Sequence, residues 1–169
     1  MLADITSWIN SNPYACIIIL TFIPALELRA SIPYGILVAK LPWFVVLPVA
    51  IIANIALGPV IYFLLDQFLH LFLRIKPIRR FWDRMIIRTQ KKVEPLVKTY
   101  GIIGLSIFIG IPLPGSGVYS GAIGGYLLGF KRWQFYLCTV IGVLIAGIVV
   151  TAAVMSGSEA FKFLFVKKV

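Results

Sequence analysis

Two ionisable residues stand inside an otherwise apolar segment near the start of the chain. Glu27 and Arg29 lie in the sequence PALELRASIPYG, which spans residues 24–35. A charged side chain at the centre of a lipid bilayer costs roughly 3 kcal/mol or more, so ionisable residues at that depth usually mark functional sites. The pair therefore predicts a site for a charged group within a membrane.

The composition predicts that this membrane surrounds most of the chain. Hydrophobic residues make up 60% of the sequence, charged residues 13%, and the mean hydropathy is +0.98. Residues 41–65, 99–130 and 133–158 contain no charged side chain, and about 20 apolar residues suffice for a transmembrane helix. The first ten residues lack the Lys or Arg of a cleaved signal peptide, so we interpret the chain as mature from Met1.

The residue types that would support catalysis or metal binding are scarce. Cys16 and Cys138 both fall in apolar helical stretches without His or acidic residues at ligand spacing, so we expect buried free thiols. No nucleophile and base pair is visible in the sequence. We therefore expect neither an enzyme nor a bound cofactor or metal.

The segment around Glu27 has a second copy ninety residues downstream, in IPLPGSGVYSGAIGG at residues 111–125. The shift of ninety aligns Pro24 with Pro114, Gly35 with Gly125 and Trp43 with Trp133. Such a register, continued through many apolar matches, indicates an internal duplication. One membrane domain should then contain repeat one at about 13–66, a connector at about 67–99, repeat two at about 100–156 and a C-terminal tail at 157–169.

Each copy reads as a short apolar helix, a proline-rich break, a second short helix and a full span that starts at the tryptophan. Residues 16–26 would form only about 16 Å of helix, half of a hydrocarbon core of about 30 Å. Proline removes a backbone donor and clashes with the preceding turn, so Pro24 and Pro33 should interrupt the helix. Each copy is thus predicted to be a re-entrant helical hairpin followed by one transmembrane helix.

The number of membrane crossings in each copy decides the relative orientation of the two copies in the membrane. One full crossing per repeat places the second hairpin on the opposite side of the membrane and gives inverted repeats whose tips meet near the midplane. Two complete crossings per hairpin would instead give parallel repeats. We predict the inverted arrangement, an all-α integral membrane protein in which a basic amphipathic helix joins the two repeats.

The connector carries most of the net charge of +10. Residues 74–98 contain nine basic and two acidic residues, a net charge of +7. The positive-inside rule places this loop in the cytoplasm, and its apolar periodicity after Pro77 predicts an amphipathic helix on anionic headgroups. Because a membrane explains the basic run, we expect no nucleic-acid partner.

Small residues recur every four positions after the second break, at Gly117, Gly121, Gly125 and Gly129. Such a stripe lets helix backbones approach closely, and we expect it to bring the two hairpins into contact. The matching positions of the first copy are Glu27, Ser31, Gly35 and Ala39. Asn54, in the middle of the first span, is expected to bond either a broken tip or a neighbouring helix.

PALELRASIPYG and IPLPGSGVYSGAIGG together resemble the small multidrug export family of bacterial and archaeal membrane proteins. That family is distantly similar to the DedA, or VTT-domain, proteins, which have paired re-entrant hairpins and include lipid scramblases and carriers of polyprenyl phosphate. The resemblance implies a multi-pass protein of the prokaryotic inner or plasma membrane. The chain has Leu113, Pro114 and Gly115 where DedA proteins place an arginine, so only Glu27 and Arg29 correspond.

These observations predict a transporter of an amphipathic substrate, namely an anionic lipid phosphate such as polyprenyl phosphate or a phospholipid. Arg29 would bind the anion and Glu27 would couple its movement to protons, since a buried carboxylate beside an arginine responds to both. The alternative is a proton-coupled exporter of lipophilic cations, with aromatic side chains as cation-π surfaces. The expected partners are membrane lipids, the substrate, protons and a second copy of the chain. The predicted substrate-binding residues are Glu27, Arg29, Ser31, Pro33, Tyr34, Pro114, Ser116, Gly117, Tyr119 and Ser120.

Overall fold

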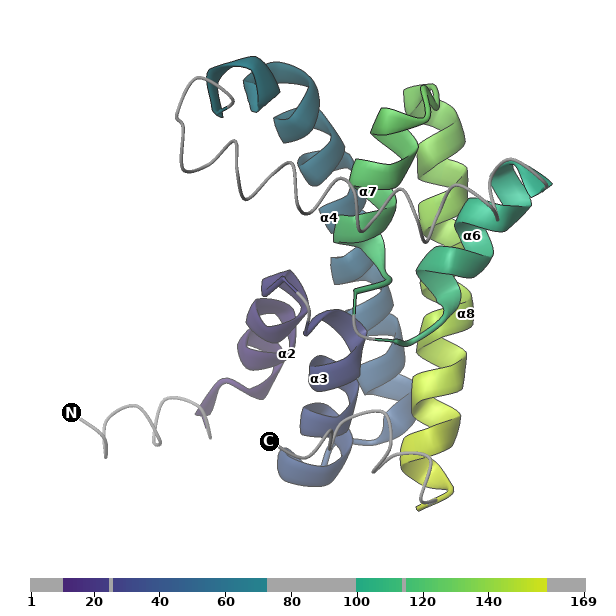
Figure 1. The fold of residues 1–169 in the computed structure, drawn as a ribbon. Coiled ribbons are helices and arrows are strands. Elements are labelled where there is room, and N and C mark those ends of the chain that lie inside the picture. The colour runs from purple at the N-terminus through teal and green to yellow at the C-terminus, as the bar shows by residue number, and fades with distance from the viewer. Residues whose placement is uncertain (1–10, 25, 73–99, 114, 158–169) are drawn as a thin grey trace, which may run out of the picture.

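The computed structural model describes residues 11–24, 26–72, 100–113 and 115–157. Throughout these residues the regular structure is helical and no strand occurs. Figure 1 shows the arrangement. The elements are α2 (Pro13–Phe22), α3 (Glu27–Pro33), the π-helical turn η1 (Tyr34–Val38), α4 (Trp43–Phe72), α6 (Ile102–Gly110), α7 (Val118–Leu127) and α8 (Arg132–Met155).

The same order of elements occurs twice: a short helix, a break, a second short helix and a long helix. Both first helices end at an isoleucine with extended backbone, Ile23 with ψ 124° and Ile111 with ψ 117°. Each isoleucine precedes a proline, Pro24 or Pro112, and the proline ring excludes the helical conformation for the residue before it. The predicted breaks are therefore confirmed, and in the second copy Pro112 is the proline that ends α6.

The predicted interruption at Pro33 is wrong. Pro33 is the last residue of α3, and the helical path continues directly into η1. Proline has no N–H to donate to a preceding carbonyl, and a π-helical turn after it absorbs the missing hydrogen bond without ending the helix.

The two long helices are antiparallel neighbours. At one end Asp66 forms an ion pair with Arg132, and the rings of Tyr62 and Phe135 stack with centroids 4.9 Å apart. Towards the other end, a Cβ on Gly147 would lie 3.0 Å from Ile51. The two long helices therefore run in opposite directions, as Figure 1 also shows.

Both α4 and α8 are long and apolar enough to cross a membrane, at Trp43–Gln67 and Arg132–Met155. Trp43 and Trp133 lie at their first turns and are exposed, as expected of interface anchors. The helices α3 and α7 each pack against both long helices, whereas α2 packs against α4 and α6 against α8. Figure 1 shows the two breaks facing each other about halfway along the long helices.

The prediction that the small-residue stripe joins the two hairpins is wrong at Gly121, and Gly125 is a packing glycine. A Cβ on Gly121 would meet Ile109 of α6, and one on Gly125 would meet Leu105 of α6. These glycines therefore let α7 approach α6 within its own hairpin. Of the four, Gly117 is the one whose surroundings include the other hairpin, because a Cβ there would meet the carboxylate of Glu27.

Some sequence predictions fall on residues that lie outside the described parts. These are the basic connector at 74–98, Pro114, and most of the C-terminal tail. The predicted buried thiols are confirmed, since Cys16 and Cys138 are both free and buried.

Candidate functional site

Arg29 projects from the first turn of α3 into the space between the two breaks, and only 7% of it is exposed. Its Nη2 donates to the Ser116 carbonyl oxygen at 2.7 Å and lies 3.0 Å from Ser116 Oγ. The guanidinium of the first hairpin therefore bonds the loop of the second hairpin.

Glu27 begins α3 and is 5% exposed. Its carboxylate accepts hydrogen bonds from the backbone N–H groups of Val118, at 3.2 Å, and Tyr119, at 3.4 Å. Those groups open α7, whose own N-cap residue, Gly117, supplies no side-chain cap. An acceptor at this position satisfies orphan N–H groups and interacts with the positive end of the helix dipole. Glu27 thus caps a helix that begins 91 residues away.

Glu27 and Arg29 do not form an ion pair within 4.0 Å, although they are two residues apart. Each charge instead bonds the second hairpin, the carboxylate through α7 and the guanidinium through the Ser116 loop. The two charges therefore hold the tips of both hairpins together.

Gly117 shows why the two copies differ at their matched positions, 27 and 117. Its φ is +111°, a conformation that favours glycine, and the Glu27 carboxylate fills the space that a Cβ would take. Glu27 also has a positive φ, +47°, which is uncommon for a residue with a side chain. The carboxylate of one copy therefore depends on the missing side chain of the other.

A second bond crosses between the hairpins in the opposite direction. The hydroxyl of Tyr119 donates to the Phe22 carbonyl oxygen at 2.5 Å. Tyr119 matches Arg29 under the shift of ninety, so each copy uses the same position to bond the break of the other. Each tip therefore donates a side-chain hydrogen bond to a backbone carbonyl of the other.

Ser116 stiffens the second break. Its Oγ lies 2.5 Å from the Ile111 carbonyl oxygen and 2.7 Å from that of Leu113, and it accepts from the Leu113 N–H at 3.2 Å. These bonds hold the loop in the conformation that presents the Ser116 carbonyl to Arg29.

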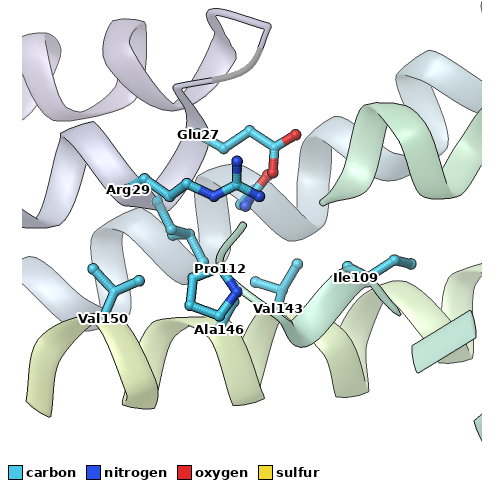
Figure 2. Close-up of a pocket in the computed structure, with 9 residues that line it drawn as sticks. Glu27, Arg29, Ile109, Pro112, Val143, Ala146 and Val150 are labelled. Atoms are coloured by element: carbon cyan, nitrogen blue, oxygen red, sulfur yellow. The ribbon is translucent and has the colours of Figure 1, made fainter. Parts of the chain in front are cut away.

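A small cavity lies beside the two charges, and Figure 2 shows Glu27 and Arg29 across it from α8. Only about 10 Å³ of it is available to the centre of a water molecule, which is about the minimum needed to hold one water. The cavity is therefore too small for a substrate headgroup in this conformation. The lining residues are Glu27, Leu28, Arg29, Asn54, Ile109, Pro112, Val143, Ala146 and Val150.

The long helix α4 contributes one polar side chain, Asn54, to the lining of the cavity. It is 1% exposed, lines the cavity with Glu27, and its Oδ1 has no hydrogen-bond partner within the described residues. A buried carbonyl without a donor costs roughly 1–3 kcal/mol, so this atom is positioned for a partner that enters the cavity.

The structure gathers about half of the predicted site residues at the two tips, namely Glu27, Arg29, Ser116, Gly117 and Tyr119. Ser31, Pro33, Tyr34 and Ser120 do not line the cavity. The prediction missed Pro112 and the residues of α8 that line the cavity. The α8 residues could have been found from the sequence, since Val143, Ala146 and Val150 recur every three or four residues on one helical face.

Two broken hairpins with buried charges at their meeting point, held between two apolar long helices, define a helical membrane protein built around an internal polar site. A family model described as "Putative small multi-drug export protein" matches residues 27–149, most of the chain. The chain belongs to this family, and it is a membrane protein with two candidate transmembrane helices. The family description implies export rather than catalysis. No curated protein and no solved structure matches the chain.

Proposed function

We propose that the protein is a carrier that moves an amphipathic anion, a lipid phosphate such as polyprenyl phosphate or a phospholipid, between the two leaflets. The observation that carries the proposal is the environment of Arg29. A buried arginine normally pairs with an acid, yet among the described residues no carboxylate lies within 4.0 Å of its guanidinium.

The guanidinium also has unused donors. Among the described residues its hydrogen bonds run through Nη2 to Ser116, which leaves Nε and Nη1 for another acceptor. The planar fork of arginine suits a phosphate, and charge-assisted bonds of this kind are among the strongest in proteins. An anionic headgroup would therefore find open donors on a guanidinium that forms no ion pair within 4.0 Å among the described residues.

The antiparallel long helices support inverted repeats in the membrane, with the tips near the midplane. In this arrangement the cell membrane of a prokaryote holds the protein, with the basic loop 74–98 in the cytoplasm. Because the cavity admits no more than about one water, transport requires the repeats to rock apart and break the bonds between the tips.

Glu27 is proposed to couple transport to protons. The charged and polar groups that face it are Arg29 on α3, Asn54 on α4 and Tyr119 on α7, while α8 contributes apolar side chains to the cavity. Neutralising the carboxylate would weaken its bonds to the α7 N–H groups and free the tips to separate. Transport by Glu27→Gln should accordingly lose its response to pH.

The second candidate is a proton-coupled exporter of lipophilic cations, which the family description favours. Glu27 would then bind cation and proton in turn, with aromatic side chains such as Tyr119 as cation-π surfaces. The fixed charge of Arg29 in the same cavity opposes a cationic substrate.

The test is flipping of a labelled polyprenyl phosphate in vesicles that contain the purified protein. Arg29→Ala loses a buried charge-assisted bond worth about 1.5–3 kcal/mol. It should therefore flip the lipid more slowly than wild type, by about tenfold or more. Arg29→Lys, which keeps the charge and loses the fork, should be intermediate.

Arg132→Ala is the matched control, because Arg132 is exposed and its ion pair with Asp66 lies at the end of the long helices. It should flip the lipid within about twofold of wild type. Equal rates for wild type and Arg29→Ala would contradict the proposal. Export of an ethidium-like dye without any lipid flipping would favour the cation exporter instead.

A further inference from the structure

The Glu27 carboxylate occupies a position that suits an anionic ligand. The N-terminus of α7, a helix of ten residues, offers the N–H groups of Val118 and Tyr119 to an oxyanion. Helix N-termini bind phosphate and carboxylate through such N–H groups and the helix dipole. Here the anion that fills the position is a side chain of the other hairpin.

Glu27 is a loosely held occupant. Its bonds to Val118 and Tyr119 measure 3.2 and 3.4 Å, whereas charge-assisted N–H···O bonds are usually about 2.7–2.9 Å. Its backbone has φ +47°, which is uncommon for a residue with a side chain. The long hydrogen bonds lower the free-energy cost of moving the carboxylate away.

Asn54 supplies a second, independent sign of a missing ligand. Its Oδ1 is buried at the same cavity and has no donor within the described residues. Arg29 lines the cavity too, with Nε and Nη1 unused. The site as a whole therefore has spare donors and one spare acceptor beside a bound carboxylate.

We infer that Glu27 is an internal substitute for the substrate anion, and that an entering phosphate monoester must displace it from the α7 N–H groups. The inference rests on the proposed function and sharpens it. Two phosphate oxygens would accept from Val118, Tyr119 and Arg29, and a P–OH group would donate to Asn54 Oδ1. Since the cavity admits about one water, carboxylate and phosphate exclude each other.

The test measures binding of hexyl phosphate to the purified full-length protein in maltoside micelles by calorimetry. If Glu27 fills the position about nine-tenths of the time, the apparent affinity of wild type is lowered about tenfold. Glu27→Gln, which keeps the shape and loses the charge, should therefore bind hexyl phosphate about tenfold more tightly than wild type.

Asp66→Asn is the matched control, since it also removes one negative charge but pairs with Arg132 away from the cavity. Its affinity should equal that of wild type, which excludes an effect of net charge alone. Hexyl sulfate, which lacks a P–OH donor, should bind Glu27→Gln more weakly than hexyl phosphate does. Inorganic phosphate bound as tightly as hexyl phosphate would support the site and identify its ligand as free phosphate.

Infrared difference spectra give a readout that does not depend on affinity. Hexyl phosphate should shift a carboxylate stretching band in wild type, and the shift should be absent in Glu27→Gln. Equal or weaker binding by Glu27→Gln, with binding lost in Arg29→Gln, would overturn the inference and leave the proposed function intact. No binding of any probe by wild type or Glu27→Gln would overturn both.

Discussion

The two hairpins share one order of elements and differ in what they bring to their meeting point. The first hairpin contributes charged side chains, Glu27 and Arg29, and the second contributes backbone groups at Ser116, Val118 and Tyr119. At matched positions a carboxylate faces a glycine whose missing Cβ makes room for it. Two hairpins with the same order of elements can therefore form one asymmetric site when each complements the other.

The hairpins also differ in how closely the matched glycines are approached by their surroundings. A Cβ at Gly35 would lie 2.6 Å from Val46 Cγ1 of the long helix α4, whereas one at Gly125 would lie no closer than 3.1 Å, to Leu105 of α6. Within its own hairpin Gly35 also has a nearest contact of 3.1 Å, to Ile17 of α2. The first hairpin is thus packed more closely against its long helix at this position.

The largest expected effect tests the complementarity of positions 27 and 117. Gly117→Ala adds a Cβ at φ +111° that overlaps the Glu27 carboxylate, so the carboxylate must leave the α7 N–H groups. Backbone strain and the lost hydrogen bonds together should cost about 3 kcal/mol of unfolding free energy. Thermal unfolding in detergent measures this loss.

Gly129→Ala is the control for backbone strain, because Gly129 has φ +75° and open space around its Cβ position. It should cost only about 1 kcal/mol. Gly117→Ala in a Glu27→Gly background should recover the part that is due to overlap. A similar cost at both glycines would show that the carboxylate does not shape this site.

A smaller effect compares the space around the matched glycines Gly35 and Gly125. Gly35→Ala should destabilise the protein by about 2 kcal/mol, because Val46 and Ile17 of its neighbouring helices must shift. Gly125→Ala should be within about 1 kcal/mol of neutral, since a milder contact is offset by better helix propensity. Unfolding in denaturant measures both, and a reversed order would contradict the packing difference.

The smallest expected effect tests the hydrogen bond of the Tyr119 hydroxyl apart from that of Arg29. Tyr119→Phe removes the hydroxyl that bonds the Phe22 carbonyl and should cost about 1 kcal/mol of stability. Lipid flipping should persist, because Tyr119 would serve the substrate through its backbone N–H.

Tyr136→Phe is the matched control, as Tyr136 lies on α8 and its hydroxyl makes no hydrogen bond within the described residues. It should change neither stability nor flipping. Loss of flipping in Tyr119→Phe as severe as in Arg29→Ala would mean that the hydrogen bonds between the two tips, rather than the charge of Arg29, are needed for transport.

Much of the architecture could be predicted from local sequence. Pro24 and the second proline-rich segment predicted the breaks because a proline restricts the residue before it. Trp43 and Trp133 marked the starts of the long helices. The prediction failed at Pro33, where η1 continues the helix, because the sequence does not show how a missing hydrogen bond is absorbed.

The sequence by itself determined that the chain enters a membrane, that two similar segments are broken at prolines, and that Glu27 and Arg29 are buried charges, since hydropathy and proline geometry act over short stretches of chain. Only the tertiary structure decided what those charges bond. Each forms hydrogen bonds with a partner about ninety residues away, because antiparallel long helices bring the two breaks to the same depth. A hydrogen bond depends on distance and direction between atoms, and for residues so far apart the packing of the whole fold sets both.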